Sequence, residues 1–146
     1  MTQPSRIPHD WLKPQWPAPA GVRALCTTRA GGVSTGPCAS LNLGSHVGDD
    51  PSAVQGATPG ARAVFLNQVH GTAVATINPA TPDGTEADAC VATQPGAVCT
   101  IMVADCLPVL LAHGSGAVVG AAHAGWRGLA GTGGVGVLEA VFERFK

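Results

Sequence analysis

Two apolar runs with a short polar turn between them constrain the fold more than any other feature of this sequence. LPVLLA ends at Ala112, HGSG follows it, and the second run, GAVVGAAHA, ends at His123 and Ala124. Short apolar runs around a glycine-containing turn predict a β-hairpin. If His113–Gly116 form the turn, Ala112 pairs with Ala117, and the same register places Cys106 directly opposite His123. Opposed Cβ atoms lie about 4.5–5.5 Å apart, so the thiol and the imidazole would meet on one face.

A second histidine follows another predicted strand. The run RAVFLNQV (62–69) alternates and predicts a strand that ends at His70. Three protein ligands with one open position are typical of a catalytic zinc site, where bound water has a pKa of about 7. A mixed nitrogen and sulfur set favours Zn²⁺, with copper as a weaker option. His70, Cys106 and His123 are therefore candidate metal ligands and candidate catalytic residues, and Asp105 is a candidate to orient one of them.

The remaining patterns predict short elements. Residues 21–29 and 96–104 predict strands, the second buried on both faces. Residues 137–145 predict a helix with its apolar side chains on one face. A partner or further chain would be needed to cover that face, so we expect a homo-oligomeric or aggregation-prone chain. We expect residues 1–20 to form an N-terminal arm and residues 21–146 to form the core.

Composition and charge exclude several classes of protein. Hydrophobic residues make up 45% of the chain and charged residues 12%, which is too apolar for a disordered chain. The net charge of -1 indicates neither a nucleic-acid-binding nor a membrane surface. The N-terminus lacks the apolar region of a signal peptide, and five cysteines without regular spacing favour reduced thiols. These features predict a cytoplasmic protein.

Five segments together resemble a known family. They are TTRAGGVSTGP, SLNLGSHVGDDP, FLNQVHGT, ADCLPVLL and AAHAGWRGLA, and they follow one another over about residues 22–145. In this combination the chain resembles the YfiH-type laccase-domain family, also called multi-copper polyphenol oxidoreductase. That family is associated with purine nucleoside phosphorolysis and adenosine deamination.

The resemblance implies a fold and a set of site residues. The implied fold is α/β, a mixed-sheet sandwich layered α-β-β-α. The implied metal ligands are His70, Cys106 and His123, the three residues that the hairpin and strand patterns indicate. Arg29 and Asn42 would bind substrate or phosphate. Family members continue well past the helix over 137–145, so the resemblance implies a core that is incomplete at the C-terminus.

Four functions compete at this point. The first is a zinc-dependent purine nucleoside phosphorylase with adenosine deaminase activity, acting on adenosine, inosine or methylthioadenosine with phosphate. The second is a metal-free cysteine hydrolase with Cys106 as nucleophile and His123 as base. His70 separates these two, because a Cys/His dyad does not need it. The third is a copper-dependent polyphenol oxidoreductase, which the absence of any His-x-His motif disfavours. The fourth is an inactive, truncated family member.

Overall fold

The structure, a computed structural model, describes residues 10–44, 48 and 61–146. The chain divides into two compact units, one of residues 1–17 and 23–59 and the other of residues 18–22 and 60–146. The first unit contains the 3-10 helix η1 (Gly36–Cys38) and an isolated antiparallel bridge between Leu12 and Cys26. That bridge replaces the strand that the sequence predicts over 21–29. The boundary expected at residue 20 stays a prediction.

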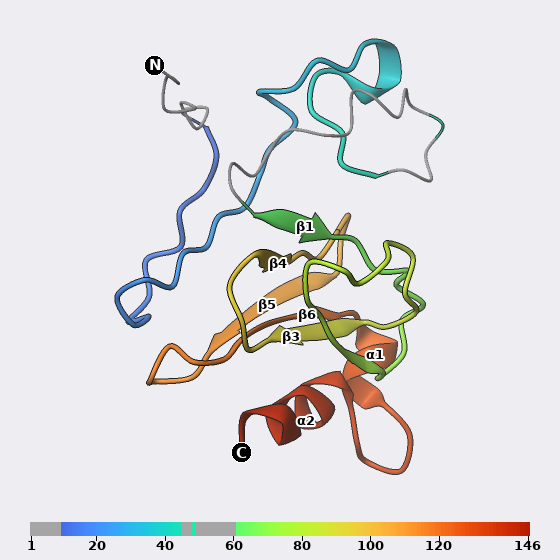
Figure 1. Cartoon of the computed structure of the whole chain (residues 1–146). Coiled ribbons are helices and arrows are strands. Elements are labelled where there is room, and N and C mark those ends of the chain that lie inside the picture. Colours follow the sequence, from blue (N-terminus) through green and yellow to red (C-terminus); the bar gives the residue numbers. More distant parts are fainter. Residues whose placement is uncertain (1–9, 45–47, 49–60) are drawn as a thin grey trace. The chain divides into compact units, whose positions relative to one another are not determined.

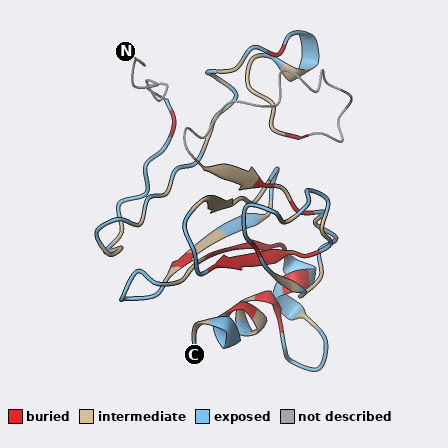
Figure 2. Cartoon of the chain, in the orientation of Figure 1, coloured by how far each residue is buried: buried red, intermediate tan, exposed pale blue. Residues whose placement is uncertain are grey.

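A mixed four-stranded sheet forms the centre of the second unit (Figure 1). Its order is β2-β3-β6-β5; β2 pairs with β3 in parallel, and the other two pairings are antiparallel. The bounds are β2 (Val74–Thr76), β3 (Ala89–Ala92), β5 (Leu107–Ala112) and β6 (Val119–Ala124). The two central strands consist mainly of small residues, and Figure 2 shows them as the most buried part of the sheet.

The predicted hairpin is present, but its register differs from the prediction. The β-turn His113–Gly116 forms, with the Gly116 N–H donating to the His113 carbonyl at 2.8 Å. Ala117 also belongs to the loop, so Ala112 pairs with Val119 and not with Ala117. The partner of every residue therefore shifts by two. Because side chains alternate with a period of two, this even shift leaves each of them on its predicted face.

Two apolar clusters cover the two faces of the sheet. Cys90 and Ala92 of β3 point into one, and Ala89 and Val91 into the other, as strand alternation requires. The first cluster packs under a parallel pair of strands, β1 (Arg62–Val64) and β4 (Ala97–Cys99). The second packs against α2 (Val137–Phe142), on the opposite side in Figure 1. The unit is thus layered as helix, sheet and sheet.

The fold class is confirmed as mixed α/β with two sheets. The described residues contain no second outer helical layer. The strand expected over 96–104 is wrong in length and burial: β4 covers three residues, all half-buried, because the chain leaves the sheet after Cys99. No helix among the described residues has the length and hydropathy to span a bilayer.

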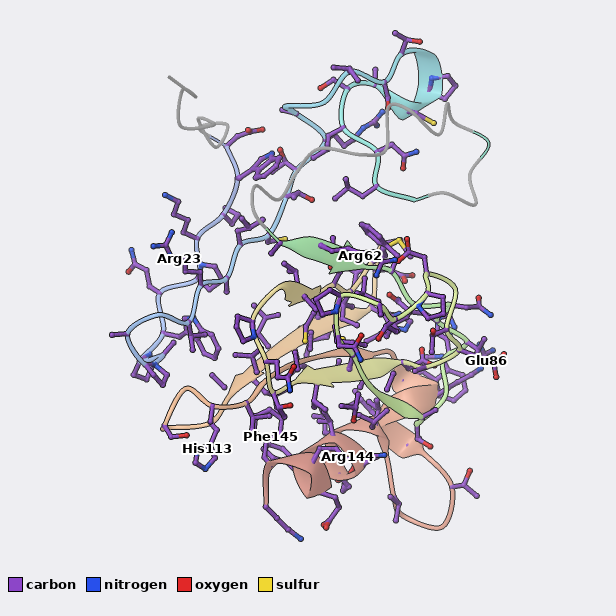
Figure 3. The ribbon with its side chains drawn as sticks, viewed as in Figure 1. Arg23, Arg62, Glu86, His113, Arg144 and Phe145 are labelled. Atoms are coloured by element: carbon purple, nitrogen blue, oxygen red, sulfur yellow. The ribbon has the colours of Figure 1, made fainter. Side chains whose placement is uncertain are left out.

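The predicted C-terminal helix is present, and part of its apolar face is covered within the chain. Val137 and Val141 are fully buried against the sheet. The 3-10 helix η2 (Glu143–Phe145) follows, and the Phe145 ring lies against Gly120 of β6 (Figure 3). The chain therefore covers part of this face, while Phe142 remains 55% exposed. Homo-oligomerisation stays a prediction.

Truncation of Val141 tests how much this contact stabilises the fold. Val141→Ala removes two methylene equivalents from a fully buried site and leaves a cavity, so we expect a loss of about 2 kcal/mol in unfolding free energy. Urea titration followed by circular dichroism measures this loss. Phe142→Ser on the same helix is the control, because Phe142 is 55% exposed; its expected effect is within about 0.5 kcal/mol. Equal effects at both positions would contradict this packing.

Candidate metal centre

His70, Cys106 and His123 lie together in the structure. Their candidate ligand atoms are all within 4.8 Å of one another, and the two imidazole rings meet edge to face with centroids 4.8 Å apart. His123 is buried near the end of β6, Cys106 is half-buried just before β5, and His70 is exposed. The group therefore reaches from the core to the surface. Its three members are those that the sequence indicates.

Asp88 fixes the orientation of the His123 ring. The Asp88 side chain is fully buried just before β3, and its Oδ1 lies 2.9 Å from His123 Nδ1. The backbone joins the same two residues, since the His123 N–H donates to the Asp88 carbonyl at 2.7 Å. A carboxylate accepts only, so Nδ1 carries a proton, and in the neutral ring the lone pair is on Nε2. In this orientation His123 would bind a metal through Nε2.

The same carboxylate shapes the turn that carries His70. Three consecutive backbone N–H groups donate to it: Val69 and Gly71 to Oδ2 at 3.1 and 2.8 Å, and His70 to Oδ1 at 2.8 Å. This is the backbone nest that proteins use to hold anions. His70 has a φ of 61°, in the left-handed region that side-chain-bearing residues seldom adopt. Asp88 therefore stabilises the strained turn that carries His70 and contacts the His123 ring directly.

The pKa of Asp88 is consistent with this role. Burial by itself would raise the pKa of this carboxyl group, but the hydrogen bonds from His123 and from the three backbone N–H groups together lower it below its usual value. Asp88 is thus ionised at neutral pH and retains the negative charge that orients His123.

The residue next to the Cys106 sulfur is a glycine, Gly125, which leaves room for the thiol near the two histidines. Continuing the β5–β6 ladder by one residue places Cys106 opposite Gly125, diagonal to His123. A Cβ on Gly125 would lie 2.8 Å from Cys106 Sγ and 3.2 Å from His70 Cδ2. Gly125 precedes α1 (Trp126–Ala130), and its φ of -72° is open to any residue. The site therefore requires glycine here for space alone.

The pKa of the Cys106 thiol is raised. Partial desolvation is the largest cause, followed by the charge and contact of Asp105, whose Oδ1 lies 3.8 Å from Sγ, and by the charge of Asp88. The prediction that Asp105 orients a ligand is only partly supported, since it touches Cys106 while Asp88 orients His123.

Sequence reasoning missed Asp88. The one signal was an acidic residue at the start of the small-residue run DACVA.

Arg29 and Asn42 lie in the first unit, where both bind their own loops. The Arg29 guanidinium donates to the Pro37 and Ala39 carbonyls, each at 3.0 Å from Nη2. The Asn42 side chain both donates to and accepts from the Gly44 backbone, at 3.2 and 3.0 Å. Their predicted substrate-binding roles remain predictions.

The three residues of the cluster suit zinc. Two imidazole nitrogens and one thiolate are ligands that Zn²⁺ binds, and three of them leave one position for another molecule. Ligand atoms of a tetrahedral zinc site lie about 3.3–3.6 Å apart, so atoms within 4.8 Å of one another need to approach by at most about 1.5 Å. His113, exposed at the far end of the hairpin, takes no part in the cluster (Figure 3).

A mixed α/β unit with a His/Cys/His group at its strand ends defines a protein with a candidate three-ligand metal centre. Comparison with known sequences then identifies the family. The chain belongs to the multi-copper polyphenol oxidoreductase laccase family, which matches residues 23–146.

Curated and solved relatives agree with this assignment. A purine nucleoside phosphorylase of Pseudomonas aeruginosa is 52% identical over 139 residues, which are 91% of this chain and 55% of that protein. The purine nucleoside phosphorylase YfiH of Escherichia coli is 46% identical over 143 residues, covering 92% of this chain and 57% of that protein. A crystal structure of a Neisseria meningitidis DUF152 protein has a TM-score of 0.80 at 46% identity, covering 93% of this chain and 57% of that one. The chain thus spans little more than half the length of these relatives.

Proposed function

We propose that this chain forms the zinc-binding part of a purine nucleoside phosphorylase that also deaminates adenosine. The observation that carries the proposal is the His70, Cys106 and His123 group, with ligand atoms within 4.8 Å. Two relatives named purine nucleoside phosphorylase, 46% and 52% identical, support the choice of reaction. The proposed substrates are adenosine, inosine and methylthioadenosine, with phosphate as co-substrate.

The chain's own residues have separate tasks in this proposal. His70, Cys106 and His123 would hold the zinc, which would supply Lewis acidity to the reaction. Asp88 keeps His123 in the tautomer that presents Nε2 to the metal. Gly125 keeps the space that the thiol occupies. Arg29 and Asn42 are the proposed contacts for phosphate or nucleoside, by family resemblance.

The two reactions share the need for an oriented nucleophile. In phosphorolysis, phosphate attacks the ribose C1′ and the purine leaves; in deamination, water adds at C6 and ammonia leaves. Positioning a nucleophile beside its electrophile accelerates either reaction. His70 is exposed, so a substrate can approach the proposed metal site from the His70 side. The same site would serve both reactions.

The metal-free cysteine hydrolase is the main alternative, and the His123–Asp88 contact favours it, because a Cys/His pair is commonly oriented by a third group. Two observations argue against it. Reactive cysteines have lowered pKa values, whereas partial desolvation, then Asp105 and last the charge of Asp88 raise the pKa of the Cys106 thiol. His70, held in a strained turn beside Cys106, would have no task in a dyad.

The copper alternative is also less well supported. Among the described residues, metal-binding side chains gather in this one group of three. A multi-copper oxidase needs several copper ions, and thiolate with imidazole is equally suited to zinc.

Substitution of the ligands tests the proposal. We expect the purified chain to bind about one zinc, and His70→Ala or Cys106→Ser to weaken zinc affinity at least about 100-fold by removing one of three ligands. Competition with a chromophoric chelator measures the affinity. His113→Ala is the control, because His113 is exposed at the hairpin tip; its expected affinity equals that of the unmodified chain.

Measurements of turnover then distinguish the zinc-dependent enzyme from the cysteine hydrolase. Phosphate-dependent cleavage of inosine and ammonia release from adenosine are expected to disappear on chelation and to return with zinc. A cysteine hydrolase would instead keep its activity after chelation and in His70→Ala. Zinc affinity unchanged in both ligand variants would overturn the proposed site.

A further inference from the structure

A glutamine links the segment that carries His70 to the loop that carries Cys106. The Gln68 Nε2 donates to the Met102 carbonyl at 2.7 Å, and its Oε1 accepts the Met102 N–H at 2.9 Å. Both polar atoms of the side chain are thus occupied, and so are both backbone groups of Met102. The amide imitates one step of a β-ladder between segments 34 residues apart in sequence.

This contact lies where regular pairing has ended. The parallel β1–β4 ladder stops at Val64 and Cys99. Beyond it, residues 100–106 form neither helix nor strand before β5 begins at Leu107. The contact between Gln68 and Met102 joins the two segments again. Gln68 lies two residues before His70, and Met102 lies four residues before Cys106. Ile101, which packs against the first apolar cluster, is the other anchor of this loop.

We infer that Gln68 is a positioning residue that sets the distance between the Cys106 thiol and the His70 imidazole. The inference rests on the proposed metal site, because only a shared ion requires these two atoms at one distance. Without the amide, Met102 keeps its neighbours but loses both hydrogen bonds, and the loop leading to Cys106 gains freedom. Substitution of a residue that orients metal ligands without binding the metal typically lowers metal affinity 10–100-fold.

Gln68→Met tests the inference, because methionine has the same chain length and cannot form either hydrogen bond. We expect zinc affinity to fall about 10-fold. In the Co²⁺-loaded chain, the thiolate-to-metal charge-transfer band should weaken relative to the d–d bands. A residue that only stabilised the fold would lower the melting temperature and leave this ratio unchanged. Gln68→Glu keeps the acceptor for the Met102 N–H and should give an intermediate effect.

Asn78→Ala is the matched control. Its Oδ1 also accepts a backbone N–H, that of Ala80 at 2.8 Å, in a turn of the same unit without a link to the cluster. We expect its Co²⁺ spectrum and zinc affinity to equal those of the unmodified chain.

A metal-free measurement separates this inference from the proposed function. In the metal-free chain, the alkylation rate of Cys106, followed by peptide mass spectrometry, should rise several-fold in Gln68→Met and not in Asn78→Ala. If the unmodified chain shows no charge-transfer band, the proposed metal site fails, and the alkylation rates still test the positioning role. Unchanged alkylation in a folded Gln68→Met or Gln68→Glu chain would overturn the inference.

Discussion

Replacement of Asp88 by alanine is expected to lower the unfolding free energy by about 3–5 kcal/mol, the largest effect of any substitution considered. The carboxylate accepts from His123 Nδ1 and from three backbone N–H groups, at 2.8–3.1 Å. Alanine leaves all of these donors without an acceptor around a buried cavity. The strained turn at His70 also loses the group that stabilises it. Urea titration of the metal-free chain measures the loss.

Asp88→Asn divides the effect on stability from the effect on metal binding. Asparagine keeps the volume and one acceptor, so we expect about half of the stability loss. Its NH₂ group can donate to His123 Nδ1, which would move the ring proton to Nε2 and block the ligand atom. Zinc affinity should therefore fall at least about 10-fold in both variants.

Asp83→Ala is the control for both Asp88 variants. Asp83 lies in the same unit, pairs with Arg62 at 3.0 Å and accepts the Phe65 N–H, but its side chain is 53% exposed. Solvent screens such pairs, so the expected loss is at most about 1 kcal/mol with unchanged zinc affinity. If Asp88→Ala behaved like Asp83→Ala, the central role of this carboxylate would be refuted.

The second large effect is expected for Gly125→Ala. The added methyl group would lie 2.8 Å from Cys106 Sγ, closer than side-chain atoms approach, and 3.2 Å from His70 Cδ2. We expect zinc affinity to fall about 100-fold, because one methyl group displaces two of the three ligands. The overpacking should lower stability by about 1–3 kcal/mol. Chelator competition and thermal melting measure the two quantities.

Gly114→Ala provides a matched control in the hairpin loop. A Cβ there meets nothing within 4 Å, and Gly114 does not have a positive φ. Its zinc affinity should be unchanged and its melting temperature equal or slightly higher, since alanine restricts the unfolded chain. A Gly125→Ala chain that bound zinc as tightly as Gly114→Ala would show that the site has more room than the structure gives it.

The sequence predicted the candidate ligands more accurately than the elements that hold them. The hairpin register was off by two, because Ala117 extends the loop, yet the even shift kept Cys106 and His123 on one face. The strand expected over 96–104 is longer than the observed β4, which ends at Cys99. The apolar residues after Cys99 belong to the loop in which Met102 bonds to Gln68. Apolar composition alone does not distinguish a ladder from such a loop.

Asp88 could not be predicted from local pattern. It lies 18 residues after His70 and 35 before His123, and its task appears only when β3 and β6 pair side by side. The spacing of a motif reports neighbours along one element, whereas this carboxylate acts between segments. The contact of Gln68 could not be predicted for the same reason, since its partner Met102 is 34 residues away in sequence.

The double use of the Asp88 carboxylate offers a means of sorting remote homologues. A diverged chain can retain histidines and cysteine at the aligned positions and still have an uncharged residue at the position of Asp88. Such a chain is expected to be less stable and to bind zinc at least about 10-fold more weakly at the proposed site. An acid directly before the third strand is therefore a marker of the proposed centre that adds to the three ligands.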